Sequence, residues 1–183
     1  MEPRPLVCDT EAILTEALPI LQGCNTLILD CEAVRLGERG GALSLITLRT
    51  TAPSPVRTYI IDVVRLPRSA LQPVFDILSS PNILKVLFDG RMDYSALYHD
   101  HGVELKNVLD IQLADVASRQ KRGERQVGQF RRLQMYLRYV NFNLNMEMYQ
   151  RMHKLSGLGE CFEEHIATRR ASKGFGVSFR NSS

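Results

Sequence analysis

The sequence predicts an α/β fold with a mixed sheet, in which three antiparallel strands are followed by crossover connections and helices flank the sheet. Three observations lead to this prediction. Short apolar runs bounded by Gly and Pro are typical of strands. The first three such runs follow one another with no helical segment between them, which favours antiparallel pairing. The later runs alternate with segments of helical period, as in right-handed βαβ crossovers.

A helix is expected before the first strand. Asp9-Thr10 is typical of an N-cap and Glu11 of a first helical turn. Apolar residues then recur at helical spacing as far as Gly23, which favours a helix end. Those residues are Ile13, Leu14, Ala17, Leu18 and Leu21. Pro19 lies inside this segment and predicts a kink or an early stop, because proline has no backbone N–H to donate.

The remaining elements follow from the same signals. We expect the three antiparallel strands at residues 26–30, 42–48 and 56–63, with a glycine-rich turn at 37–41. Helices are expected at 66–78, 92–98 and 111–117, separated by strands at 83–88 and 107–110. Residues 119–130 are basic and predict a mobile loop, and residues 131–152 predict a helix rich in Tyr and Met. We expect one domain over residues 1–170 and a disordered Ser/Gly/Arg-rich tail at 171–183.

The composition is that of an intracellular globular protein. The chain has 183 residues, of which 44% are hydrophobic and 23% charged. No apolar stretch approaches the roughly 20 residues that a membrane span needs. The four cysteines, at positions 8, 24, 31 and 161, show no CxxC spacing, which argues against a zinc ribbon or a thioredoxin-type site. We expect buried thiols in a reducing compartment, either cytoplasm or nucleus.

The net charge of +3 conceals an asymmetry along the chain. Residues 1–115 carry 10 basic and 15 acidic side chains, whereas residues 116–183 carry 13 basic and 5 acidic ones. An acidic site beside a basic surface suits a polyanionic substrate that Lys and Arg hold by its phosphates. A solvated basic helix face with no specific partner explains the same charges equally well.

The most informative motif is Asp30-Cys31-Glu32 at the end of the apolar run at residues 27–29. Because side chains alternate along a strand, Asp30 and Glu32 point to the same face. Two neighbouring carboxylates repel each other, and a hard divalent cation between them relieves the repulsion. A third carboxylate, Asp93, follows the predicted strand at 83–88. These three residues are our candidate catalytic and metal-binding set.

The motifs resemble those of the DEDD 3′–5′ exonuclease family, the RNase D and Werner-exonuclease-like group with a ribonuclease-H-like fold. The similarity covers residues 8–118 and is greatest to the divergent eukaryotic branch that includes Egalitarian. The first family motif is Asp-x-Glu at the end of the first strand, which Asp30 and Glu32 match. The second is an Asp on the helix after the fourth strand, which Asp93 matches, with Asp89 where the family usually has Asn.

This resemblance implies two-metal hydrolysis of phosphodiester bonds in RNA or DNA, with single-stranded nucleic acid as the partner. Two cations, Mg²⁺ or Mn²⁺, lie about 4 Å apart, activate a water and stabilise the leaving oxygen. On this reading Asp30 bridges both metals, Glu32 binds one and orients the water, and Asp93 holds the second. Asp110, at the end of the family's fifth strand, is expected to be structural.

One family motif is missing from the sequence. The third motif, Tyr-x-x-x-Asp or His-x-x-x-Asp, supplies a fourth carboxylate, but residues 116–183 contain no Asp. Tyr139 is followed four residues later by Asn143, and His165 by Arg169. Two alternatives therefore stand beside an active exonuclease. One is a catalytically inactive nuclease-like module that binds nucleic acid or acts as a scaffold, and the other is a truncated relative without a role of its own.

Simpler explanations exist for the individual residues. Glu32 is also what a surface turn would carry, and Asp93 suits the first turn of any helix because of the helix dipole. The four histidines are more typical of surface positions than of ligands. Three aromatic side chains between residues 136 and 142 suit either base stacking or a packed core. They are Tyr136, Tyr139 and Phe142.

Overall fold

The structure is a computed structural model that describes residues 3–53, 55–134, 146–149 and 152–167. The chain forms two compact units, residues 1–111 and residues 112–183, which we call unit 1 and unit 2. The predicted tail at 171–183 and the three aromatic residues between 136 and 142 lie outside the described residues. We describe each unit by itself.

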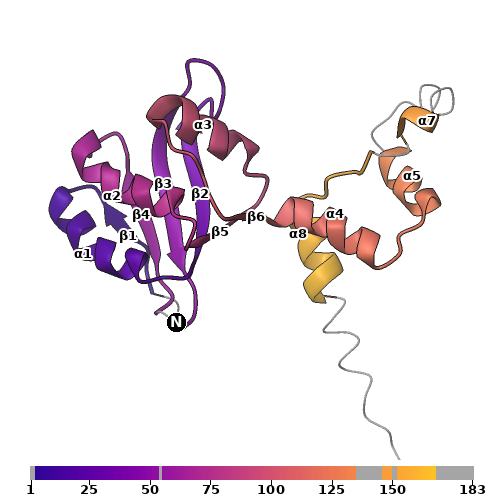
Figure 1. Cartoon of the computed structure of the whole chain (residues 1–183), viewed down its shortest axis with the longest axis horizontal. Coiled ribbons are helices and arrows are strands. Elements are labelled where there is room, and N and C mark those ends of the chain that lie inside the picture. Colours follow the sequence, from indigo (N-terminus) through magenta and orange to yellow (C-terminus); the bar gives the residue numbers. More distant parts are fainter. Residues whose placement is uncertain (1–2, 54, 135–145, 150–151, 168–183) are drawn as a thin grey trace, which may run out of the picture. The chain divides into compact units, whose positions relative to one another are not determined.

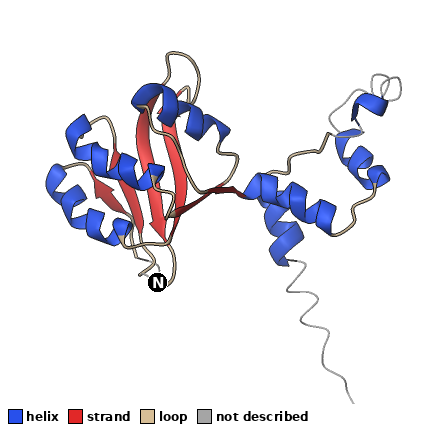
Figure 2. Ribbon diagram, viewed as in Figure 1, coloured by secondary structure: helices blue, strands red, loops and turns tan. Residues whose placement is uncertain are grey.

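Unit 1 contains the sheet (Figures 1 and 2). Its elements in chain order are β1 (Leu6–Cys8), α1 (Glu11–Gln22), β2 (Thr26–Val34), β3 (Ala42–Thr50), β4 (Thr58–Asp62), α2 (Arg68–Ser79), β5 (Leu84–Leu87), α3 (Arg91–His101) and β6 (Val108–Asp110). The strand order is β1-β4-β3-β2-β5-β6. Neighbours β2, β3 and β4 are antiparallel, whereas β1–β4, β2–β5 and β5–β6 are parallel. The predicted α/β fold with a mixed, ribonuclease-H-like sheet is therefore confirmed.

One face of the sheet forms the hydrophobic core. Along β2, Leu27, Leu29 and Cys31 are buried, whereas Ile28 and the acidic residues alternate with them on the exposed side. The apolar faces of α1, α2 and α3 join the same core, and each fully buried aliphatic side chain contributes about 1.5–3 kcal/mol. The sheet thus has a packed face and an open face within unit 1, and the acidic residues of β2 lie on the open one.

Two details of unit 1 differ from the prediction. Strand β1 was not expected, because the three residues that follow Pro5 are too few to give an alternating pattern, yet Leu6–Cys8 pair in parallel with β4. Helix α1 does not stop at Pro19 but continues to Gln22. The helix loses one backbone hydrogen bond there, and the burial of Ala17 and Leu21 on its core face offsets that loss.

Unit 2 is helical in its described part. Its elements are α4 (Ile111–Lys121), which begins at the boundary, α5 (Gln126–Gln134), α7 (Met146–Tyr149), α8 (Leu158–Phe162) and the π-helical turn η1 (Glu163–Ala167). The loop predicted at 119–130 is shorter in the structure, because α4 ends only at Lys121 and α5 already begins at Gln126. The long helix predicted at 131–152 is described only near its two ends, where residues 131–134 belong to α5 and 146–149 to α7.

All four cysteines are buried thiols, as the sequence predicted. No helix in the part of the chain that the structure describes has the length and hydropathy of a membrane span.

Candidate active site

The acidic motif lies on the exposed face of β2. Asp30 and Glu32 are both exposed, and Cys31 between them points into the core. Strand β5 pairs with β2 only from Thr26 to Ile28. Beyond that point β5 no longer covers the edge of β2, so a side chain from another element has access to its backbone there.

Asp93 takes up this position. It lies in the first turn of α3, which follows β5, and only 6% of its surface is exposed. Its Oδ1 atom accepts a hydrogen bond of 2.7 Å from the backbone N–H of Cys31. The carboxylate of Asp93 therefore lies against the peptide bond that joins Asp30 to Cys31, although 62 positions separate Asp93 from Cys31 in the chain.

The electrostatics of the site reflect this crowding. Burial raises the pKa of Asp93, and the negative charge of Asp30 raises it further, against the lowering effect of the hydrogen bond from Cys31. Burial and the charges of Asp93 and Asp30 raise the pKa of the Cys31 thiol as well. Cys31 is therefore a neutral thiol at physiological pH and not a reactive thiolate.

The turn before α3 is held by Asp110 at the end of β6. Its carboxylate accepts hydrogen bonds from the backbone N–H groups of Asp89 (3.2 Å) and Gly90 (3.1 Å). This arrangement supports the structural role that the resemblance implied for Asp110. Asp89, the departure from the family's Asn, has a positive φ of 53° and forms an ion pair of 2.7 Å with Arg91. That pair offsets the extra negative charge near the site.

Two further polar contacts fix α3 along the hairpin formed by β2 and β3. The Ser95 hydroxyl donates a hydrogen bond of 2.8 Å to the carbonyl of Gly37 in the connecting loop. At the other end of the helix, the Asp100 carboxylate accepts a hydrogen bond of 3.2 Å from the backbone N–H of Leu43 on β3. Together with Asp93, these side chains attach three successive parts of α3 to three successive parts of the hairpin.

A cavity of about 520 Å³ lies between this loop and α3. Its lining includes Gly37, Glu38 and Arg39 from the loop and Ser95, His99 and Asp100 from the helix. None of the three candidate carboxylates is among the described residues that line it. We place the candidate chemistry at the carboxylates, because they form the acidic motifs and none of them lines the cavity.

Asp30, Glu32 and Asp93 all offer carboxylate oxygens, which are the hard ligands that Mg²⁺ and Mn²⁺ prefer. The structure brings Asp93 to the backbone of the motif, close enough for Asp30 to perturb its pKa, and leaves Glu32 on the same strand face as Asp30. Among the described residues, however, no three His, Cys, Asp or Glu side chains form a group that could hold a metal ion.

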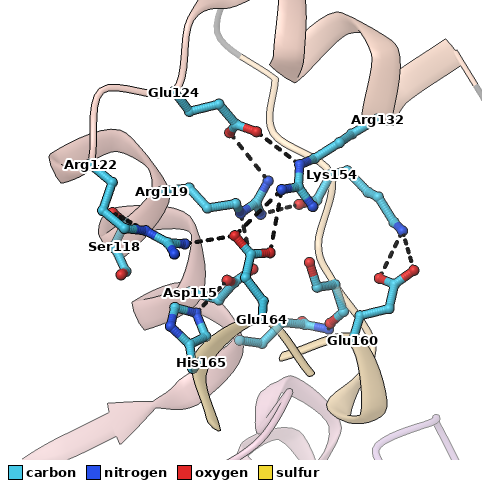
Figure 3. A network of polar contacts seen from close by, with 12 residues as sticks. Asp115, Ser118, Arg119, Arg122, Glu124, Arg132, Lys154, Glu160, Glu164 and His165 are labelled. Atoms are coloured by element: carbon cyan, nitrogen blue, oxygen red, sulfur yellow. Dashed lines mark hydrogen bonds and ion pairs between the residues drawn. The ribbon is translucent and has the colours of Figure 1, made fainter. Parts of the chain in front are cut away.

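Unit 2 contains a second polar centre, which the sequence analysis missed (Figure 3). Asp115 and Arg119 on α4 form an ion pair of 3.1 Å, and their side chains are 0% and 1% exposed. His165 of η1 contacts the other oxygen of Asp115 at 2.8 Å. The spacing of four residues between Asp115 and Arg119 was the available signal, but it is also typical of exposed helical pairs.

This centre extends into a network that neutralises much of the basic charge. Four Lys and Arg residues pair with acidic side chains of unit 2, as Figure 3 shows. They are Arg119, Arg122, Arg132 and Lys154. Among the described residues, Lys121, Arg125 and Arg131 are exposed and have no ion-pair partner. Four of the seven Lys and Arg residues in the described part of unit 2 are therefore engaged in ion pairs.

Solved structures of several ribonucleases are similar to this chain. RNase D from Trypanosoma brucei in complex with RNA U12 is 31% identical, with a TM-score of 0.56 over 63% of this chain and 40% of that one. The chain thus spans about two fifths of the length of that enzyme. No curated protein sequence matches the chain significantly.

More distant structures agree in fold alone. The EXO domain of Nibbler from Aedes aegypti is 17% identical, with a TM-score of 0.55 over 69% of this chain and 63% of that one. RNase D from Escherichia coli, an exoribonuclease involved in structured RNA processing, is 22% identical, with a TM-score of 0.53 over 62% of this chain and 28% of that one.

A protein-family model described as 3′–5′ exonuclease matches residues 5–160, which include all of unit 1 after its first residues and most of the described part of unit 2. The match contains the acidic motif of β2 and the helix that carries Asp93. The chain therefore belongs to the 3′–5′ exonuclease family.

Proposed function

We propose that this chain is a 3′–5′ exonuclease domain that hydrolyses phosphodiester bonds of single-stranded RNA or DNA with divalent cations. The observation that carries the proposal is the hydrogen bond from Cys31 to Asp93, which brings a carboxylate of α3 to the acidic motif of β2. Asp30, Glu32 and Asp93 would hold Mg²⁺ or Mn²⁺, and the cations would supply an activated water and stabilise the leaving oxygen. The family match and the RNA bound by the Trypanosoma brucei enzyme support this choice of substrate.

The test is digestion of 5′-labelled single-stranded RNA and DNA with Mn²⁺ or Mg²⁺. We expect products that shorten from the 3′ end, that disappear with EDTA, and that fall about 100-fold or more in Asp30→Asn, because one metal ligand contributes several kcal/mol of transition-state stabilisation. Asp76→Asn is the matched control, since this exposed carboxylate lies on α2 and bonds only to Gln72 among the described residues. Equal activity of Asp30→Asn and Asp76→Asn would refute the proposed site.

A second function is favoured by one specific observation. Residues 116–183 contain no Asp, and the described residues hold no group of three potential metal ligands. We therefore propose, as the alternative, a nuclease-like module that binds single-stranded nucleic acid without cleaving it, as an Egalitarian-like relationship would suggest. A labelled strand that keeps its full length and gives a salt-sensitive gel shift with the protein would select this alternative. Negligible binding at about 50 mM salt, where phosphate contacts are strongest, would exclude it.

A further inference from the structure

We infer that Ser95 is a positioning residue, which fixes the place of α3 and so holds the Asp93 carboxylate at the acidic motif of β2. The inference rests on the proposed function, because it assigns to Ser95 the alignment of the proposed metal ligands. Its starting point is the direction of the Ser95 hydroxyl. A serine inside a helix commonly bonds to the carbonyl four residues before it. Ser95 bonds instead to Gly37, 58 residues away in the chain.

The contact that Ser95 makes is supported by close backbone packing. Gly37 has a positive φ of 69°, and a Cβ atom built there would lie 2.7 Å from the carbonyl oxygen of Met92. The loop therefore approaches the first turn of α3 as closely as a glycine allows. Met92 directly precedes Asp93, so a displacement of the loop relative to the helix acts on the turn that carries the carboxylate.

Ordinary packing does not replace the hydrogen bond. Beyond Gly37, the loop and α3 are separated by the cavity of about 520 Å³, which Ser95 itself lines. Few side-chain contacts hold the two segments together across such a space. Within the loop, Arg35 donates a side-chain hydrogen bond of 2.6 Å to the Gly40 carbonyl, and the backbone N–H of Glu38 donates to the Arg35 carbonyl at 3.1 Å. Ser95 is thus a polar link between this internally bonded loop and the helix of Asp93.

The first test needs no metal. In the metal-free protein we expect the amide of Cys31, which donates to Asp93, to exchange its hydrogen up to about 10-fold faster in Ser95→Ala, as loss of alignment weakens that hydrogen bond. The amides of Leu45 to Arg49 on β3, which pair with neighbouring strands and not with α3, serve as the internal reference, because a general loss of stability accelerates both. Ser69→Ala on α2 is the matched control, since Ser69 is exposed and its hydroxyl makes no hydrogen bond among the described residues. Equal acceleration of Cys31 and β3 would overturn the inference.

The second test is Mn²⁺ binding by calorimetry. A residue that aligns metal ligands typically changes affinity by 10–100-fold, so we expect a dissociation constant about 10-fold higher or more in Ser95→Ala and recovery in Ser95→Thr, which keeps the hydroxyl. The unfolding midpoint should fall by only about 2–4 °C. Should Ser95→Ala fold poorly, Ser95→Cys, a weaker donor of similar shape, replaces it. Wild-type protein that binds Mn²⁺ no better than Asp30→Asn would refute both the proposed function and this role, whereas equal binding by wild type and Ser95→Ala would overturn the role of Ser95 alone.

Discussion

Asp93 combines two tasks in one carboxylate. It completes the hydrogen bonding of β2 where β5 has ended, and it is a candidate metal ligand. Burial of a carboxylate costs free energy, and here the nearby charge of Asp30 adds to that cost. The buried charge of Asp93 and its repulsion by Asp30 are therefore unfavourable, and a bound divalent cation would relieve both.

This unfavourable charge predicts a stabilising substitution. Asn at position 93 keeps an oxygen that accepts from Cys31 but removes the buried charge. Because the pKa of Asp93 is raised in the fold, its stabilising contribution is complete only below its unfolded-state pKa and is lost as the pH rises through the folded-state value. We expect Asp93→Asn to have a higher free energy of unfolding than wild type at pH 7.5 and the gain to shrink towards pH 4.5, as measured by urea unfolding.

The control for this experiment is Asp76→Asn, which alters an exposed carboxylate. Its difference from wild type should change little over the same pH range. A lower stability of Asp93→Asn at pH 7.5 would show that the ionised carboxylate contributes more to the fold than its burial costs. The same variant should lose nuclease activity, so that stability and activity change in opposite directions.

At the scale of elements, α4 is held by charge rather than by apolar packing. The described buried residues of unit 2 are Gln112, Asp115, Arg119, Gln129, Ser156 and Cys161, so only one of them is apolar. Apolar side chains such as Leu113 (58% exposed) and Leu158 (61% exposed) are instead accessible to solvent. Burial would raise the pKa of Asp115, but the hydrogen bond with His165 and the charge of Arg119 hold it below its ordinary value.

Removal of one partner from this pair should be costly. Arg119→Met leaves the buried Asp115 with only part of its compensation, and we expect a loss of about 3–5 kcal/mol in the stability of α4. Arg122→Met is the control, because Arg122 is 48% exposed and its ion pair with Glu164 is worth about 0–1 kcal/mol. Hydrogen exchange of the α4 amides measures both. Equal protection in the two variants would mean that the buried pair does not hold the helix.

The contrast between α3 and α4 shows that the sequence predicts the position of an element but not the long-range contacts of its side chains. The strand pattern around Asp30 and the helical signals at residues 92–98 predicted where both elements lie, because alternation and helix signals are local. The contact of Asp93 with a backbone N–H on β2 was not predictable, since no local pattern marks which peptide a distant carboxylate will meet. The buried charges of unit 2 were not predicted, because in a sequence they cannot be told apart from the charges of a solvated basic helix face.

At the scale of the whole molecule, ion pairing determines how many basic side chains are available to contact a ligand. Lys121, Arg125 and Arg131 are the exposed basic residues of the described part of unit 2 that lack ion pairs. If single-stranded nucleic acid binds there, each phosphate contact contributes about 0.7 to the slope of log K against log salt. Among the described residues of unit 2, ion pairs therefore reduce the number of basic side chains that are available for such contacts.

Binding measured at several salt concentrations tests this view. We expect Arg125→Ala and Arg131→Ala each to lower the salt slope for a labelled single strand by about 0.7, in fluorescence anisotropy with EDTA present to prevent cleavage. Arg65→Ala is the matched control, because Arg65 is an exposed arginine of unit 1 in ion pairs with Asp9 and Asp62. Slopes that fall equally in all three variants would argue against a specific role for unit 2.

The hydrogen bond between Cys31 and Asp93 also bears on how such chains diverge. Loss of the acceptor at position 93 would leave a strand N–H without its partner near the core, so the fold itself favours Asp, Asn or another acceptor there. A descendant that had ceased to cut nucleic acid would remain under pressure to keep this oxygen. On the proposed function, selection for folding and selection for chemistry would act on the same side chain, whereas Asp30 and Glu32, exposed on the open face of the sheet, would be free to change once cleavage is no longer needed.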